Sequence, residues 1–224
     1  MGMLDKLKQL VEEAQKRGVR AVDASQFSHP VAAQTEWHPL KPGGANFQTH
    51  RLDDSNPDLL VFRATTFTKV FCGIFAGVGV LGIAIPLLIF MHQGGTDWGL
   101  LLFAFLFGGI FLTAGLLMYY FMATPRVFDT FYGCYYKGRK KPEHTLGMSR
   151  DEPHAITHLN EVVAIQVISE RISSKNGSYR SYEINLVKQD GSRINVVDHG
   201  KPAAVITDAE ILATQLGLPL WDAS

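Results

Sequence analysis

Two long apolar stretches separated by a short polar turn constrain this chain more than any other feature. Residues 70–91 and residues 98–122 contain no Asp, Glu, Lys or Arg. A bilayer core about 30 Å thick needs about 20 apolar helical residues, and both stretches reach that length. Because backbone polar groups cannot stay unpaired in lipid, each stretch is expected to be a helix. The sequence therefore predicts a transmembrane helical hairpin in preference to two buried helices of a soluble protein.

The charges that flank the apolar stretches predict their orientation. The connecting turn, residues 92–97, contains the acid Asp97 but no Lys or Arg, whereas the outer flanks contain many basic residues. Lys and Arg accumulate near the cytoplasmic ends of membrane helices, so both arms and both termini are expected in the cytoplasm. The first apolar stretch begins near residue 70, far from residue 1, which predicts an uncleaved anchor and not a signal peptide.

Small residues within the apolar stretches predict close packing of the two helices. Gly73-xxx-Gly77 and Ala104-xxx-Gly108 both follow the small-xxx-small pattern of helix pairs in membranes. Neither stretch contains an Asp, Glu, Lys, Arg or His. Because ion and proton pathways normally need such a side chain, a transporter or a channel is not expected.

Two segments of different composition precede the first apolar stretch. In residues 1–18, Leu4, Leu7 and Val11 recur at helical spacing, which predicts an amphipathic helix. This helix is expected to lie on its own domain, on the bilayer surface or on a partner. Residues 19–46 are rich in Pro, Gly, Ser and Gln, which predicts a linker.

The remaining residues predict a β-rich soluble domain that ends in a helix. Residues 47–66 contain two short strand patterns around a dense turn cluster, which predicts a β-hairpin. Residues 126–222 contain further strands, and in one of them Glu183 and Asn185 alternate with apolar residues, as in a half-buried strand. Residues 202–216 predict the helix, because a Pro opens the stretch and a Gly and a Pro follow it.

The sequence predicts two strands before the apolar stretches, two just after them, three later and then the helix. Four strands, three strands and a C-terminal helix give the strand count of a pleckstrin-homology barrel. Residues 186–200 and 216–222 resemble the corresponding parts of uncharacterised bacterial two-span membrane proteins with pleckstrin-homology-like cytoplasmic domains. The resemblance covers about a third of the chain and rests on structural motifs. It implies an α+β, mainly antiparallel, pleckstrin-homology-like barrel that serves as a binding or assembly module in the bacterial inner membrane.

The connections around the apolar stretches predict that the helical hairpin is inserted into this single domain, after its second strand. The two ends of a helical hairpin lie about 8–10 Å apart, and neighbouring strands lie about 5 Å apart. A helical hairpin can therefore replace a loop between adjacent strands. The alternative is two separate arms, in which the isolated β-hairpin of residues 47–66 would be marginally stable.

The chemistry-bearing residues give little sign of catalysis. The charges balance, with 21 basic and 21 acidic residues, and neither arm is strongly basic, so nucleic-acid binding is not expected. No GxSxG, P-loop, GxGxxG or CxxC motif is present. His154 and His158 lie four residues apart but lack further ligands, so neither a metal nor any other cofactor is expected.

A run of basic residues follows the second apolar stretch and is the one candidate site. Basic residues close to anionic lipid each contribute about 1 kcal/mol of attraction. This favours a contact with lipid head groups, and the alternative is a solvated flank that only sets the orientation. The candidate residues are Lys137, Arg139, Lys140 and Lys141.

These observations predict a non-catalytic, multi-pass protein of the bacterial inner membrane whose cytoplasmic domain binds a protein or lipid partner in envelope assembly or regulation. The first alternative is an immunity protein against a membrane-acting toxin, which also needs no catalytic residues. The second is a lipid-modifying enzyme. The sequence leaves open whether the chain forms a homo-oligomer.

Overall fold

The computed structural model describes residues 22–140, 156–174 and 177–224. The predicted helix of residues 1–18 lies outside these ranges. The chain divides into two compact units, and each is described separately here. Arg63–Pro125 form the helical unit, while the described residues before Arg63 and those from Arg126 onward together form the β-rich unit.

The helical unit consists of α2 (Thr66–His92) and α3 (Trp98–Met122), both long and apolar enough to cross a membrane. Helix α2 begins four residues before the apolar stretch because Thr65 caps it, with Thr65 Oγ1 accepting a hydrogen bond from Thr68 N at 3.2 Å. Asp97 caps α3 in the same way, accepting from Leu100 N at 2.9 Å. The two predicted helices are therefore confirmed as helices.

The helices approach each other most closely at glycines. A Cβ atom at Gly79 would lie 2.3 Å from Leu112 N, so only a glycine fits there. Ala104 and Gly108 are buried, as their small-xxx-small pattern predicts. The prediction for Gly73-xxx-Gly77 is wrong, since a Cβ atom at either glycine would meet no atom within 4 Å. The contact face of α2 is instead rotated toward Gly79.

The first sheet of the β-rich unit places the helical unit between two neighbouring strands. Strand β2 (Leu59–Ala64) pairs antiparallel with β3 (Arg126–Asp129), with Leu60 opposite Phe128 and Phe62 opposite Arg126. One residue joins β2 to α2, and residues 123–125 join α3 to β3. The predicted insertion after the second strand agrees with this pairing. The sheet order is β1-β2-β3-β4-β5, in which the remaining strands are β1 (His50–Asp53), β4 (Cys134–Lys137) and β5 (Ile156–His158).

The second sheet has the order β8-β7-β6-β9. Its strands are β6 (Val162–Ser174), β7 (Gly177–Lys188), β8 (Arg193–His199) and β9 (Leu220–Ala223). Helix α4 spans Pro202–Leu216, the range expected from the sequence, and ends at Gly217, whose positive φ of 64° closes the helix. Strand β9 was not predicted; it pairs parallel with β6, placing Leu220 opposite Ile165.

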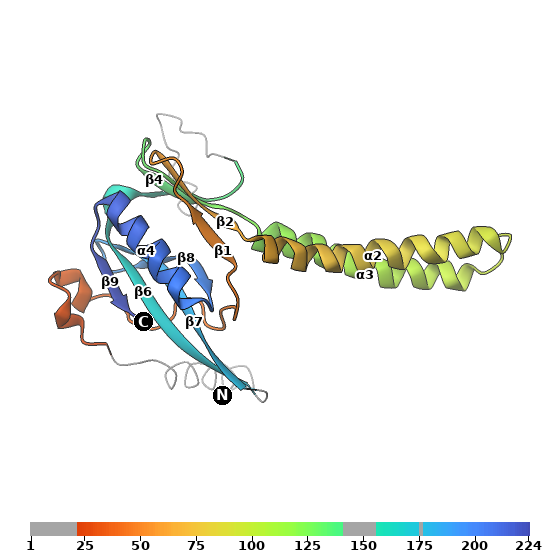
Figure 1. The fold of residues 1–224 in the computed structure, drawn as a ribbon, viewed down its shortest axis with the longest axis horizontal. Coiled ribbons are helices and arrows are strands. Elements are labelled where there is room, and N and C mark those ends of the chain that lie inside the picture. The colour runs from red at the N-terminus through yellow and green to blue at the C-terminus, as the bar shows by residue number, and fades with distance from the viewer. Residues whose placement is uncertain (1–21, 141–155, 175–176) are drawn as a thin grey trace, which may run out of the picture. The chain divides into compact units, whose positions relative to one another are not determined.

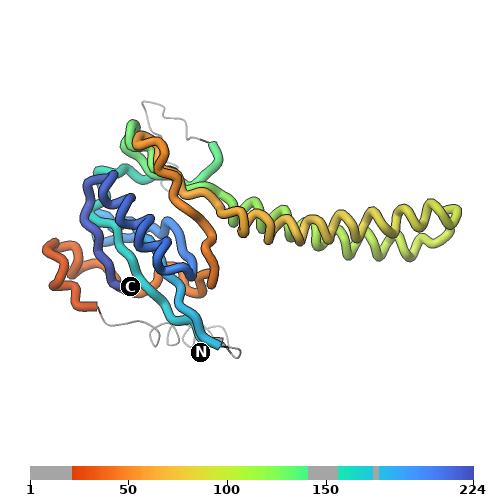
Figure 2. The backbone as a smooth tube through the Cα atoms, viewed as in Figure 1, coloured from red at the N-terminus to blue at the C-terminus, as the bar shows by residue number. Residues whose placement is uncertain are grey.

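The main apolar core joins segments that precede and follow the helical unit in the chain. The first sheet contributes Leu60, Phe62, Phe128 and Tyr135, the second contributes Ile165, Ile184 and Leu186, and α4 contributes Val205, Ala209 and Leu212. Figure 2 shows the chain before the helices running beside the chain that follows them. The two sheets do not close into the expected barrel within the described residues. The edge of β6 is occupied by β9, while the first sheet ends at the three-residue strand β5.

The segment before β1 packs on the second sheet, although its composition suggests a linker. It contains two short 3-10 helices, η1 (Ala24–Gln26) and η2 (Pro30–Ala33). Val31 and Ala32 are buried against Ala164, Val187 and Trp221 of the sheet. Figure 1 shows these helices beside β9. Residues 34–46, called the strap below, continue from η2.

Candidate binding site

A row of buried polar side chains lies under the strap, on the face of the second sheet opposite α4. Gln166 and Asn185 are fully buried, and Glu183 is 4% exposed. Gln166 of β6 lies opposite Asn185 of β7, and Asn185 lies opposite Asn195 of β8, so the amides form a line across three strands. The half-buried pattern of β7 suggests a solvated polar face, but the strap covers it.

Glu183 is the centre of this row and accepts four hydrogen bonds. Its carboxylate accepts from Leu40 N at 2.7 Å and Lys41 N at 2.6 Å, both in the strap. It also accepts from the side-chain amides of Asn185 and Asn195, each at 3.2 Å. Hydrogen bonds to a charged acceptor are stronger than neutral ones, so these donors stabilise a carboxylate that lies away from water.

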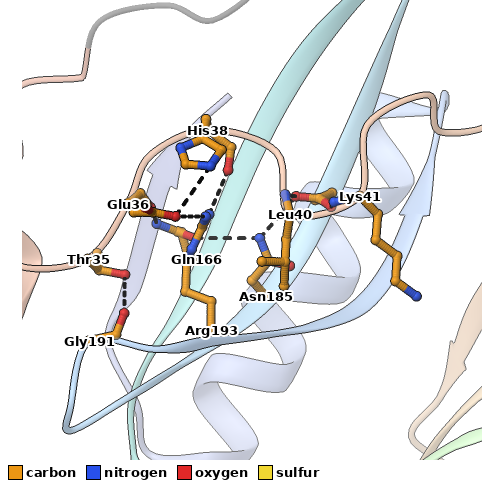
Figure 3. A network of polar contacts seen from close by, with 10 residues as sticks. Thr35, Glu36, His38, Leu40, Lys41, Gln166, Asn185, Gly191 and Arg193 are labelled. Atoms are coloured by element: carbon orange, nitrogen blue, oxygen red, sulfur yellow. Dashed lines mark hydrogen bonds and ion pairs between the residues drawn. The ribbon is translucent and has the colours of Figure 1, made fainter. Parts of the chain in front are cut away.

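Other sheet side chains bind the strap through its backbone (Figure 3). Gln166 Nε2 donates to the carbonyl of Glu36 at 3.1 Å, and Arg193 Nη1 donates to the carbonyl of His38 at 2.7 Å. Further along, the Tyr179 hydroxyl donates to the carbonyl of Gly44 at 3.0 Å. The sheet therefore holds the strap mainly by its peptide groups, independently of most strap side chains.

An aromatic cluster fixes the start of the strap. Trp37 stacks on Phe27 with ring centroids 4.8 Å apart and planes 8° apart, and it contacts Trp221 of β9 at 5.9 Å. Trp37 Nε1 donates to the carbonyl of Ala32 at 2.9 Å. Trp37 is thus a packing residue, and its polar atom has a partner.

Three cations lie near one another where Lys41 extends from the middle of the strap: Lys41, Arg126 and Lys137, here called the cation cluster. Arg126 and Lys137 are directly opposite each other on β3 and β4. Arg126 Nε donates to the carbonyl of Val196 at 3.0 Å, and its Nη1 donates to His50 Nε2. Lys41 and Lys137 are both exposed. Of these three cations, only Lys137 belongs to the site that the sequence predicts. Lys41 is distant from it in the chain and reaches the cluster through the path of the strap.

The charges in this region perturb one another. Partial burial, followed by the neighbouring cations Arg126 and Lys41, lowers the pKa of Lys137 to about 8. Burial, followed by the Glu183 carboxylate, raises the pKa of Asp198, whereas Lys41, Arg126 and Lys137 act in the opposite direction. Burial also lowers the pKa of Arg126. The cluster therefore brings like charges together next to Asp198.

The remaining predicted site residues lie next to this cluster in the chain. Lys137 is the last residue of β4, and Arg139 and Lys140 follow it as exposed residues in a bend. Lys141 lies outside the described residues, and so does His154. Within the described ranges, no group of three or more His, Cys, Asp or Glu side chains is placed to hold a metal ion.

Comparison of the chain with known protein families, curated proteins and solved structures finds no match. The β-rich unit offers two arrangements of different chemistry. The buried polar row is committed to the strap through the hydrogen bonds given above. The cation cluster has its lysines at the surface, so it is the arrangement that can meet a ligand from outside.

Proposed function

We propose that this chain is an integral protein of the bacterial inner membrane whose β-rich unit is a non-catalytic docking module for a protein or lipid partner. The helical hairpin serves as the anchor, with both termini in the cytoplasm. The module acts in envelope assembly or regulation by holding its partner at the cytoplasmic face of the membrane.

One observation carries this proposal: α2 and α3 replace the loop between two strands that pair with each other. The connectors of one and three residues are too short for a flexible tether. A soluble domain attached in this way stays close to the bilayer, which suits a protein that presents a binding surface there. An enzyme acting on soluble substrates gains nothing from such an attachment.

The charge distribution supports the orientation. The turn between α2 and α3 contains Asp97 and no Lys or Arg, whereas Lys69 and Arg126 flank the outer ends of the helices. This is the bias of helices whose basic ends face the cytoplasm. The non-catalytic character is supported by Glu183, the carboxylate with the most hydrogen bonds in the candidate site, since the four donors that it accepts from fix the strap and the neighbouring amides.

We also propose that the β-rich unit is an open relative of the pleckstrin-homology arrangement. Strands β1 to β4, then β6 to β8, then α4 follow the order of four strands, three strands and a helix. Strands β5 and β9 are additions to that order. A crystal structure in which the two sheets do not enclose the α4 side chains between them would contradict this assignment.

The experiment that tests the anchor and its orientation combines extraction with reporter fusions. The chain should stay in the membrane fraction at alkaline pH and require detergent for release. Alkaline phosphatase should be inactive when fused at residue 224 and active when inserted at Gly95. Release without detergent would refute the anchor, and the reverse reporter pattern would refute the orientation. A pull-down of the intact chain in mild detergent then identifies any protein partner.

A further inference from the structure

We propose that Lys41, Arg126 and Lys137 together hold the phosphate of an anionic lipid head group. This inference rests on the membrane location proposed above and names one partner of the docking module. The site lies at the end of the β-rich unit where β2 runs toward α2 and where β3 begins after α3.

The first argument is that three segments bring positive charge to one place. Arg126 opens β3, Lys137 ends β4, and Lys41 arrives on the strap. Like charges directly opposite each other on neighbouring strands destabilise a sheet, and Arg126 and Lys137 are such a pair. A bound anion would remove this repulsion, so the arrangement suits a domain that functions with its ligand in place.

The second argument concerns the countercharges. Glu183 is buried beneath the strap and accepts hydrogen bonds from four donors, two of which are the strap amides of Leu40 and Lys41. Asp198 is opposite Glu183 and is half-buried. Within the described residues, neither Lys41 nor Lys137 takes part in an ion pair. Lys41 and Lys137 are exposed, whereas Glu183 is buried and Asp198 is half-buried, so the cluster presents its cations to solvent more fully than its carboxylates.

The third argument concerns the type of anion. A phosphate has several acceptor oxygens and can meet two ammonium groups and a guanidinium at the same time. Arg126 follows Met122, the last residue of α3, by four positions, and a connector of that length spans at most about 14 Å. Lipid phosphates lie at the level where a transmembrane helix ends, so a lipid is a nearer source than free phosphate.

The test uses the full chain in a non-ionic detergent and measures thermal unfolding during lipid titration. Phosphatidylglycerol should stabilise the wild-type chain, whereas phosphatidylcholine and inorganic phosphate should have little effect. The variant K41Q/K137Q should bind phosphatidylglycerol roughly 30-fold more weakly, at about 5-fold for each removed cation. The matched control R139Q/K140Q removes the same charge from the neighbouring bend and should lose less than about 5-fold.

Four outcomes would overturn the inference. Equal losses in the two double variants would indicate diffuse surface attraction and no site. An unchanged affinity in K41Q/K137Q would exclude the two lysines, and equal stabilisation by inorganic phosphate would replace the lipid by the free anion. Without lipid, K41Q/K137Q should unfold at about the same temperature as the R139Q/K140Q control, because the repulsion that it removes is offset by lost attraction to Asp198. A clearly lower temperature would assign the lysines a structural role. A chain that needs no detergent would instead refute the anchor itself.

Discussion

Replacing Glu183 by Gln should release the strap from the second sheet while leaving the rest of the β-rich unit folded. The carboxylate receives Leu40 N and Asn185 Nδ2 on one oxygen and Lys41 N and Asn195 Nδ2 on the other. A Gln side chain keeps one oxygen and turns the other position into an NH₂ group. One pair of donors then faces the NH₂ group, which is itself a donor, so two of the four hydrogen bonds are lost.

The magnitude follows from the strap amide that loses its acceptor. A buried donor left without an acceptor costs about 1–3 kcal/mol, and opening of the strap returns this amide to water. The strap should therefore open more easily by about 1–3 kcal/mol. Since every 1.4 kcal/mol is a factor of ten, exchange of the Leu40 or Lys41 amide hydrogen should accelerate roughly 5- to 150-fold.

Native-state hydrogen exchange with mass spectrometry measures this effect on peptides that cover the strap. The control is E210Q, which changes an exposed carboxylate on α4 and should alter stability by less than about 0.5 kcal/mol. If strap exchange in E183Q equals that in E210Q, Glu183 does not hold the strap and the reasoning is refuted. If exchange accelerates equally throughout β6 and β7, the strap and the sheet open together and the local account is wrong.

Three further predictions test other parts of the fold. Gly79→Leu should separate the helices and lower the thermal stability of the detergent-solubilised chain, typically by about 1–3 kcal/mol, whereas Gly77→Leu should be tolerated because the site is open. His199 is fully buried and its pKa is lowered to about 4, mainly by burial, so the unfolded chain binds the extra proton first. The contribution of His199 to the free energy of unfolding should be fully present above about pH 6.5 and should fall by up to about 3 kcal/mol as the pH drops to about 4. Denaturant titrations of His199→Gln should lack this dependence on pH. Burial raises the pKa of Asp208 to about 6, so its ionisation costs stability as the pH rises from about 4 to 6. Asp208→Asn, which can still accept from Leu52 N, should therefore be more stable at pH 7 by about 1–2 kcal/mol, allowing for partial solvation, and an unchanged or lower unfolding midpoint would contradict this.

The elements that the sequence predicts well are those whose signals are local. The apolar stretches, the Pro and Gly that bound α4, and the alternation in β7 each depend on residues close together in the chain. The pairing of β2 with β3 was also accessible, because the ends of a helical hairpin must return to neighbouring positions.

The parts that were missed depend on contacts between distant residues. Glu183 lies in an alternating strand and has the sequence pattern of a solvent-facing residue. It is buried because the backbone of the strap, which has no regular secondary structure, covers it. Strand β9 is only four residues long, too short for a clear sequence pattern. It forms because β6 offers an open edge. The same limit applies to Lys41, whose place in the cation cluster depends on how the strap crosses the sheet.

The buried polar row has a consequence that an apolar face would lack, because it fixes the strap in one register. Apolar contacts tolerate a shift of one residue, whereas a shift of the strap would separate Leu40 N and Lys41 N from Glu183 and the carbonyl of His38 from Arg193. The register in turn decides which side chain stands beside Arg126 and Lys137. A polar sheet face that binds backbone groups thus places Lys41, a residue from the irregular part of the chain, at a defined position in the cation cluster.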